Sequence, residues 1–227
     1  MSVLIFDADD TLWENNIYFE RAFDDFADFL DHSSLTPLQV REVLNEIELA
    51  NAKIHGYGSL NFGRNLQQAY RHLAEREIRA DDLAHVMSLA ARILEQPLEL
   101  IAGVEETLAE LSGRHDLALF TKGHAEEQRL KVDRSGLGRY FGHATIVKEK
   151  DAEAYARLVE ERGFALDATW MIGNSPKSDI NPALEAGLGA VLVPHPHTWV
   201  LEHQEVRAPA GSRYLQVEAI GDLPRHF

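Results

Sequence analysis

Short apolar runs that stop abruptly at polar residues are the feature that most constrains the fold of this chain. The four runs predicted to be strands cover residues 3–6, 117–120, 169–172 and 190–193. Each run is continuous rather than alternating, which is typical of a strand buried on both faces of a parallel sheet. The predicted helices around them cover residues 104–111, 125–134, 152–162 and 181–186. This alternation predicts an α/β fold with a doubly wound parallel sheet and its chemistry at the carboxyl ends of the strands.

The segment 14–97 has a different pattern. Its apolar residues keep helical spacing in three stretches, beginning near Phe19, Val40 and Leu83, and no strand signal interrupts them. We therefore predict a helical cap at 14–97, inserted into a catalytic core formed by 1–13 and 98–227. The glycine-rich segment 55–64 is predicted to be a mobile or ligand-facing loop, with a plain helix–helix connection as the alternative. Tyr57 and Arg64, which lie in it, are candidates for substrate specificity.

The charge balance limits the partners of the protein. The chain has 227 residues, with 22 Lys and Arg against 37 Asp and Glu, a net charge of −15. Nucleic acid and anionic membranes are therefore not expected as partners, because both attract basic surfaces. The absence of cysteine excludes disulfides, thiolate metal sites and a thiol nucleophile. Without signal-peptide features or an apolar run of about 20 residues, we expect a cytoplasmic location.

Polar residues follow the first two predicted strands. Asp7 and Asp9 come directly after the first strand, and their i, i+2 spacing points both carboxylates to one face while the chain stays extended. Two like charges held this close require a cation, a shared proton or a catalytic role. The alternative is that they are turn or helix-capping aspartates. After the second strand, the Thr121 hydroxyl and the backbone N–H groups that follow, from Lys122 onward, can hold a phosphate oxygen.

The later strand ends carry complementary groups. Lys148 and Lys150 precede the predicted helix at 152–162, where a lysine can neutralise carboxylates and phosphate. Asn174 and Asp179 follow the next strand and offer oxygen ligands for a hard cation. Because parallel strands end at one edge of the sheet, these groups are expected to converge with those after the first two strands.

These residues resemble the motifs of the haloacid dehalogenase superfamily along the whole chain. The segment 7–11 is similar to the first motif, Thr121 to the second, Lys150 to the third, and 173–175 with Asp179 to the fourth. The helical block lies where cap-bearing members carry their cap. The resemblance implies a Rossmann-like core and a Mg²⁺-dependent phosphatase that hydrolyses a small phosphorylated metabolite through an aspartyl-phosphate.

The resemblance also implies the roles of individual residues. Asp7 would be the nucleophile and Asp9 the general acid and base. The residues implied to bind phosphate are Thr121, Lys122 and Lys150. The residues implied to bind Mg²⁺ are Asp7, Asp9 through its backbone carbonyl, Asn174 and Asp179. Asn174 stands where most members have aspartate, so either Asn174 or Asp179 would be the direct ligand, and Lys148 remains an alternative to Lys150.

Other functions remain as alternatives to a phosphatase. A metal-independent haloacid dehalogenase of the same fold also uses an aspartate nucleophile, but it expels halide, which needs no proton. Asp9 and Asp179 would then have no task. A non-catalytic phospho-accepting module shares an aspartate, a hydroxyl and a lysine at strand ends, yet it has no use for an inserted cap.

His195 and His197 follow the last predicted strand and could reach the cleft. Two prolines, Pro194 and Pro196, interrupt this segment, so the histidines lack a helical metal-ligand spacing. We therefore do not predict zinc binding there.

Overall fold

In the computed structural model, which describes residues 1–227, the chain divides between Glu14 and Asn15 and again between Pro97 and Leu98. Residues 1–14 and 98–227 form the core unit, and residues 15–97 form the cap unit. The sequence pattern had placed the first of these boundaries one residue earlier. The core unit encloses two hydrophobic clusters and the cap unit one.

A six-stranded parallel sheet, in the order β3-β2-β1-β4-β5-β6, forms the centre of the core unit. The strands are β1 (Val3–Phe6), β2 (Asp116–Lys122), β3 (His143–Val147), β4 (Thr169–Gly173), β5 (Gly189–Leu192) and β6 (Tyr214–Gln216). The main helices are α5 (Val104–Ser112), α6 (Ala125–Ser135), α7 (Ala152–Arg162) and α8 (Asn181–Glu185). The predicted doubly wound parallel sheet is confirmed. Because β1 is central, its carboxyl end is flanked by those of β2 and β4.

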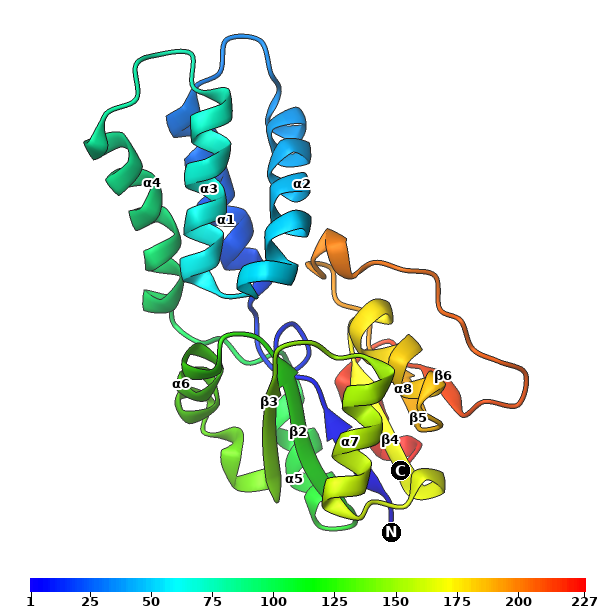
Figure 1. Ribbon diagram of the computed structural model, residues 1–227. Helices are drawn as coiled ribbons and strands as arrows, with labels where there is room; N and C mark the ends of the chain where they lie inside the picture. The colour runs from blue at the N-terminus through cyan, green and yellow to red at the C-terminus, as the bar shows by residue number, and fades with distance from the viewer. The chain divides into compact units, whose positions relative to one another are not determined.

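Helices cover both faces of this sheet (Figure 1). Leu4 and Phe6 pack on the face covered by α5, whereas Ile5 packs on the opposite face with residues of α7 and α8. Successive side chains of a strand point to opposite faces, so a strand covered on both sides must be apolar throughout. This explains why β1 reads as an unbroken hydrophobic run.

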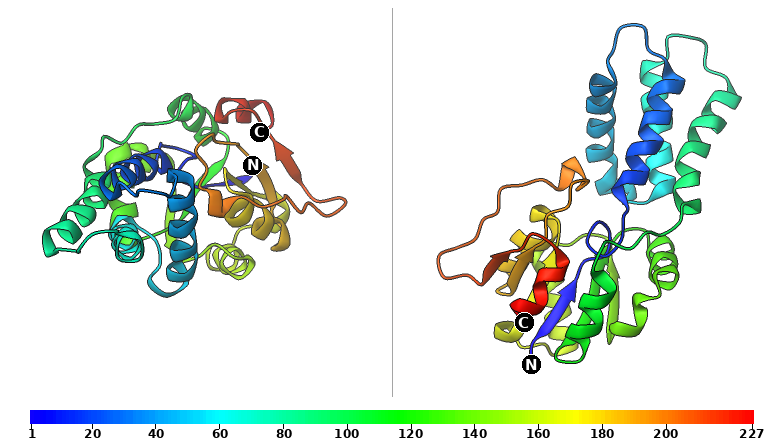
Figure 2. Two further views of the ribbon diagram at one scale, coloured as in Figure 1. Left: turned by 90° about the horizontal axis from the view of Figure 1, so that it is seen from above. Right: turned by 180° about the vertical axis from the view of Figure 1, so that it is seen from behind.

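The two edge strands were missed in the sequence. His143 and Ala144 of β3 are exposed, and β6 has only three residues, so neither strand gives a continuous apolar run. The prediction for β2 ended too early, because the strand continues through Thr121 and Lys122. After β5 the chain runs out along the side of the sheet before it returns as β6 (Figure 2). This excursion, residues 193–213, supports the candidate site described below.

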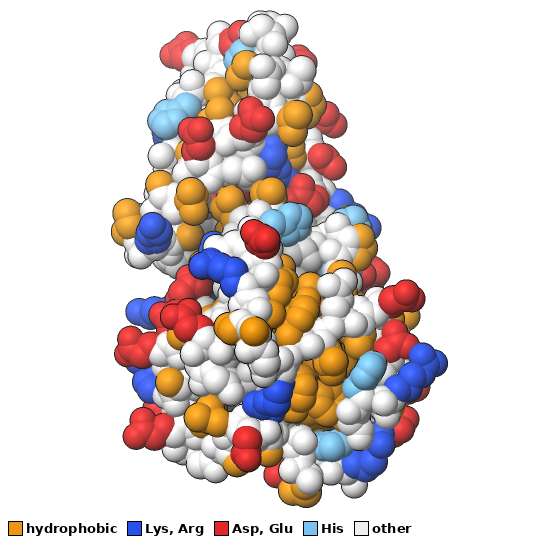
Figure 3. Space-filling model, turned by 90° about the vertical axis from the view of Figure 1, so that its right-hand side faces the viewer, with side chains coloured by type: hydrophobic (Ala, Val, Ile, Leu, Met, Phe, Trp, Pro, Cys, Tyr) orange, Lys and Arg blue, Asp and Glu red, His pale blue; other side chains and the backbone are white.

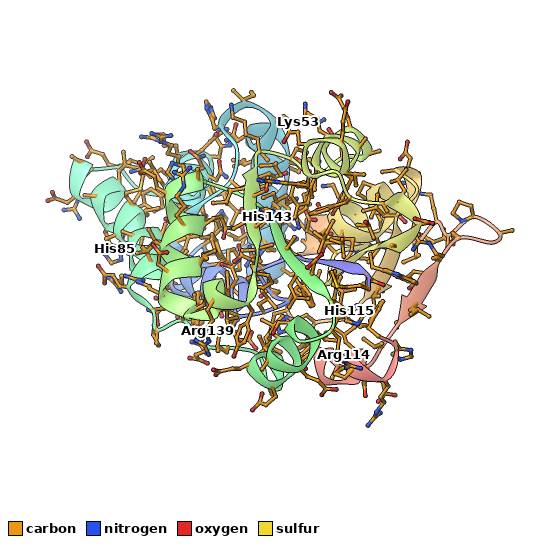
Figure 4. The ribbon with its side chains drawn as sticks, turned by 90° about the horizontal axis from the view of Figure 1, so that it is seen from below. Lys53, His85, Arg114, His115, Arg139 and His143 are labelled. Carbon is orange, nitrogen blue, oxygen red and sulfur yellow. The ribbon has the colours of Figure 1, made fainter.

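Both ends of the chain are hydrogen-bonded near the amino ends of the strands. The imidazole of His115 contacts the Ser2 backbone nitrogen through Nδ1 at 3.2 Å and the Phe227 backbone oxygen through Nε2 at 3.2 Å. Arg114 lies beside His115 and donates to the same Phe227 oxygen at 3.3 Å (Figure 4). The carboxyl ends of the strands, at the opposite edge, are therefore free of these contacts.

The surface of the core unit does not gather basic side chains in one area on the face shown in Figure 3. Hydrophobic side chains lie in the middle of that face, and charged side chains of both signs surround them. None of the helices combines the length and the apolar composition that spanning a membrane requires.

Four helices build the cap unit: α1 (Asn16–Leu30), α2 (Pro37–His55), α3 (Ser59–Leu73) and α4 (Ala80–Ala91). Their apolar faces enclose a core that includes Phe26, Leu44, Leu66, Tyr70 and Val86. α2 begins with a capping box, in which the Thr36 side chain accepts from the Gln39 N–H while the Gln39 side chain accepts from the Thr36 N–H. The predicted helical insertion is confirmed.

The prediction of a loop through residue 64 is wrong, because α3 begins at Ser59. Gly63 lies inside α3, and a Cβ there would lie 2.6 Å from Sδ of Met87 on α4. This glycine allows close packing of two helices instead of a turn. Tyr57 lies in the short connection before α3, and Arg64 is exposed on α3, where it donates to Asn61 Oδ1 at 2.9 Å. Glycine occurs both in turns and at close contacts between helices, so the glycines of this segment did not show whether it was a loop or the start of a helix.

A carboxyl group is buried among the cap helices. Glu48 of α2 is 7% exposed, and its Oε2 has no hydrogen-bond partner. Burial raises the pKa of Glu48 to about 7, with Glu20 adding to this rise and Arg41 opposing it. Arg41 is itself paired with Glu20 and stacked on the Phe23 ring. Glu48 is therefore protonated in the folded cap at pH values where the unfolded chain has lost the proton.

We predict that the free energy of unfolding falls as the pH rises from about 4.5 to 7, because the folded state then retains a proton that the unfolded state has released. The full effect is about 3 kcal/mol for a shift of this size. Urea denaturation at pH 5 and pH 8 measures it. Glu48→Gln should remove the part of this pH dependence that comes from Glu48 and leave the part that comes from the buried Asp7, whereas Glu46→Gln, at an exposed position of the same helix, should retain both. Equal pH slopes in the wild type and Glu48→Gln would contradict the prediction.

Candidate active site

A buried lysine joins two aspartates at the carboxyl edge of the sheet. Asp7 follows β1, Asp179 follows β4, and Lys150 lies just before α7. The Lys150 ammonium donates to Asp7 Oδ1 and, at 2.7 Å, to Asp179 Oδ1. Lys150 is 3% exposed and Asp179 is 1% exposed. Of the two candidate lysines it is thus Lys150 that the fold brings to the aspartates, while Lys148 is exposed.

The chain turn after β1 fixes the orientation of Asp7. The Asp7 N–H continues the sheet by donating to Ile172 O at 2.9 Å. The chain then turns, with Thr11 N and Leu12 N both donating to Ala8 O and Asp10 in the left-handed region at φ 57°. This turn places the Thr11 hydroxyl 3.1 Å from Asp7 Oδ2. Both carboxylate oxygens of Asp7 therefore have a donor.

The loop after β4 brings an amide beside this pair. Asn174 Oδ1 lies 3.2 Å from the Thr11 hydroxyl, and Asn174 Nδ2 donates to the Thr198 hydroxyl at 2.9 Å. Thr198 thus fixes which end of the amide faces Asp7. Asp179 Oδ2 accepts from the Ser175 N–H at 3.0 Å, so the same loop anchors the second aspartate. Asn174 and Asp179 both offer an oxygen near Asp7.

The cluster carries more negative than positive charge. Burial, together with the charge of Asp179, raises the pKa of Asp7 to about 7, although Lys150 opposes the rise. Burial lowers the pKa of Lys150, but Asp179 and Asp7 outweigh it, and the net direction is upward. When both aspartates are ionised, two carboxylates and one ammonium leave one negative charge uncompensated in a buried place, which is why the pKa of Asp7 is raised. Oxygen donors with excess negative charge suit a hard divalent cation, so Asp7, Asp179 and Asn174 fit Mg²⁺.

Asp9 is held by a separate set of donors. Its carboxylate accepts from Trp13 Nε1 at 2.8 Å, from Gln128 Nε2 at 2.7 Å, and from Lys131 Nζ at 2.9 and 2.8 Å. Gly123 makes room for this arrangement, since a Cβ there would lie 2.8 Å from Gln128 Nε2. These partners of Asp9 were not predicted from the sequence. The only available signal was the i, i+3 spacing of Gln128 and Lys131, which places them on one face of α6.

The two residues predicted to bind phosphate after β2 differ in their surroundings. Thr121 is buried at the end of β2. The Lys122 ammonium instead donates to Glu202 Oε1 at 2.6 Å and to the Ser178 hydroxyl at 2.8 Å. Burial lowers the pKa of Lys122, but Glu202 outweighs it and the pKa is raised. The charge of Lys122 is thus paired with Glu202.

Glu202 lies in the 193–213 excursion, and no sequence signal marked it. Its Oε2 accepts from the hydroxyls of Ser175, at 2.6 Å, and Ser178. One buried carboxylate therefore ties the excursion to β2, through Lys122, and to the loop that carries Asn174 and Asp179.

A second group of metal-ligating side chains lies nearby. One ligand atom from each of Asp10, Glu14 and His195 lies within 4.8 Å of the others. His195 Nε2 is 3.3 Å from Glu14 Oε1, and His195 Nδ1 is 3.9 Å from Asp10 Oδ1 and accepts from the His197 N–H at 3.3 Å. This group could hold a cation, but both ring nitrogens of His195 already have protein partners.

The sequence model of one protein family, described as haloacid dehalogenase-like hydrolase, matches residues 1–187. The chain belongs to this family. In this haloacid dehalogenase-like hydrolase, the Asp7, Lys150 and Asp179 cluster and the Asp9 carboxylate all fall in the matched region. No curated protein sequence matches the chain.

Solved structures of the family have the same fold. A haloacid dehalogenase-like hydrolase from Xanthomonas campestris is 28% identical with a TM-score of 0.85, and the match covers 100% of this chain and 94% of that one. The putative hydrolase YfnB from Bacillus subtilis, solved with magnesium bound, is 18% identical with a TM-score of 0.70, covering 99% and 97%. L-2-haloacid dehalogenase from Xanthobacter autotrophicus is 18% identical with a TM-score of 0.61, covering 99% and 97%. A predicted phosphoglycolate phosphatase is also among the similar structures.

We predict that Gly173→Ala disrupts the site of this hydrolase. A Cβ at Gly173 would lie 2.2 Å from Asp179 Oδ2 and 2.5 Å from Asp179 Cγ, so the carboxylate must move. Overpacking of this kind costs about 1 to 3 kcal/mol of stability, and displacing a functional group by about 1 Å costs about 100-fold in activity. Urea denaturation and hydrolase assays measure the two effects. Gly221→Ala, where a Cβ meets nothing within 4 Å, is the control. Full activity of Gly173→Ala would mean that Asp179 is not needed.

Proposed function

We propose that the protein is a Mg²⁺-dependent phosphatase that hydrolyses a small phosphorylated metabolite through an aspartyl-phosphate on Asp7. The observation that carries this proposal is the second carboxylate, Asp9, which follows Asp7 by two residues and is held by three side chains of the core unit. Displacement of halide from a haloacid requires no proton, so that reaction would give Asp9 no task. Phosphate ester hydrolysis needs a group that first donates a proton and then accepts one.

The proposed reaction has two steps. A carboxylate oxygen of Asp7 attacks phosphorus, the bond between phosphorus and the ester oxygen breaks, and the departing oxygen takes a proton from Asp9. Water then gives a proton to Asp9 and its oxygen attacks the same phosphorus, which releases phosphate and restores the Asp7 carboxylate. The Lys150 ammonium and the Thr121 hydroxyl would stabilise the charge on the transferring phosphoryl oxygens.

Mg²⁺, held by Asp7, the Asp9 carbonyl and either Asn174 or Asp179, would supply positive charge that screens the phosphate from the carboxylates. The uncompensated negative charge of the Asp7, Lys150 and Asp179 cluster supports this assignment, and so does the magnesium bound to the related structure from Bacillus subtilis. At a net charge of −15, the protein does not attract an anionic substrate at long range, so local cations must do so.

The substrate would be a small metabolite rather than a nucleic acid or a membrane component. The acidic chain supports this part of the proposal, because phosphate-rich polymers require a basic surface. We assign substrate selection to the cap unit, with Tyr57 and Arg64 as the residues to test first, because every group assigned to bond making belongs to the core unit.

The proposal predicts that the purified protein hydrolyses para-nitrophenyl phosphate with Mg²⁺ and loses this activity in EDTA, because the phosphate cannot approach unscreened carboxylates. Release of para-nitrophenol, with and without chelator, measures this. As a comparison, 2-chloropropionate should give no chloride release. Chloride release that is insensitive to EDTA, without phosphatase activity, would identify a dehalogenase instead.

Substitutions of the two carboxylates, Asp7 and Asp9, are predicted to affect different steps of the reaction. Asp7→Asn removes the attacking group, so turnover and covalent phosphorylation should both fall by at least about 1,000-fold. Asp9→Asn should slow hydrolysis of alkyl phosphates by about 100-fold or more, while still allowing phosphoryl capture from an aryl phosphate, whose leaving group hardly needs a proton. Rapid-quench measurement of the phosphorylated protein separates these outcomes. Full turnover of an alkyl phosphate by Asp9→Asn would disprove the acid and base role.

A further inference from the structure

The Asp9 carboxylate has no unused acceptor position. Oδ1 accepts from Trp13 Nε1 at 2.8 Å and from Lys131 Nζ at 2.9 Å, while Oδ2 accepts from Gln128 Nε2 at 2.7 Å and from Lys131 Nζ at 2.8 Å. A carboxylate offers about four lone-pair positions, and here each is occupied. A leaving-group oxygen therefore cannot meet Asp9 unless one of these donors moves.

Lys131 is the donor best able to move. Trp13 is buried in the hydrophobic core, and Gln128 is buried with its amide nitrogen also donating to Lys122 O at 3.0 Å. The Lys131 side chain is 15% exposed and consists of a flexible chain ending in one ammonium. An ammonium released from a carboxylate in a partly buried place requires another anion as its partner.

We propose that Lys131 binds a second anionic group of the substrate, on the leaving-group side of the phosphate ester, and in doing so frees Asp9. This inference rests on the proposed phosphatase function, since it uses Asp9 as the group that meets the leaving oxygen. An oxygen within about 2.8 Å of the Asp9 carboxylate lies within about 5.6 Å of Lys131 Nζ. A carboxylate on the carbon next to the ester therefore lies within reach of the ammonium.

A second polar atom indicates that this cluster is completed by a ligand. Gln128 is 3% exposed, and its Oε1 is buried without a hydrogen-bond partner, although its Nε2 is fully used by Asp9 and Lys122. A buried acceptor left unfilled costs free energy unless a donor reaches it. A hydroxyl of the leaving group would supply one. The substrate class that fits is a phosphate monoester whose leaving group carries an anion close to the ester oxygen.

The test compares two ligands that differ in one charge, 2-phosphoglycolate and its carboxamide. Their inhibition constants against para-nitrophenyl phosphate are measured with Mg²⁺, and their affinities are measured by calorimetry with Mg²⁺ in an Asp7→Asn background, where no turnover is expected. The wild type should prefer the carboxylate at least about tenfold. Lys131→Met should reduce this preference to about twofold or less, because it weakens binding of 2-phosphoglycolate but not of the carboxamide. Lys131→Arg should restore part of it, and Arg129→Met, at an exposed position of the same helix, should keep the full preference.

Two results would overturn the inference: a wild type that binds both ligands equally, or a Lys131→Met variant that weakens both to the same extent. Circular dichroism of each variant confirms that the fold is retained. Phosphatase activity without a charge preference would overturn this inference alone. A charge preference that depends on Lys131, in a protein that hydrolyses no phosphate ester, would overturn the proposed function but leave the anion site in place.

Discussion

The ion pairs of Lys150 with Asp7 and Asp179 are the interactions on which the rest of the core unit depends. A buried ammonium and two buried carboxylates are stable only when they are close together, because each would lose the solvation of water without gaining a partner. Asp7 belongs to the end of β1, Asp179 to the loop after β4, and Lys150 to the entry of α7. Their pairing therefore requires the carboxyl ends of β1 and β4 to lie level, as they do where Phe6 pairs with Ile172.

Around this pairing lies a second layer that comes from a distant part of the chain. Thr198 orients the amide of Asn174, and Glu202 binds the hydroxyls of Ser175 and Ser178 together with the Lys122 ammonium. Both residues belong to the excursion between β5 and β6. The segment that carries Asn174 and Asp179 forms a helical turn over Pro176–Ile180, and these contacts fix its polar side chains, while Ile180 anchors it in the hydrophobic core. The excursion is thus a structural support for the site.

The strands that are buried on both faces could be predicted from the sequence. β1, β2, β4 and β5 appear as apolar runs because both faces of these strands are covered, and Asp7 and Asp179 were expected to lie together because parallel strands end at one edge. The choice between Lys150 and Lys148 stayed open because β3, the strand before them, gave no signal. The edge strands β3 and β6 lack that signal. The contacts of Lys131 with Asp9 and of Glu202 with Lys122 join residues 122 and 80 positions apart, and their pairing depends on how elements pack in space. Gly63 was misplaced because its sequence neighbours do not reveal Met87.

The contact between Gly63 and Met87 also has a chemical consequence. The thioether sulfur of Met87 lies 2.6 Å from the position of an added Cβ on Gly63, so an added atom at that point would force the Met87 side chain to move. Oxidation of a thioether to a sulfoxide adds one oxygen and turns an apolar group into a polar one. An oxidised Met87 could not keep its sulfur against α3, and its half-buried side chain would have to turn away from Gly63. The contact of α3 with α4 at Gly63 is thereby the place in the cap unit where oxidation of a sulfur atom changes the local packing.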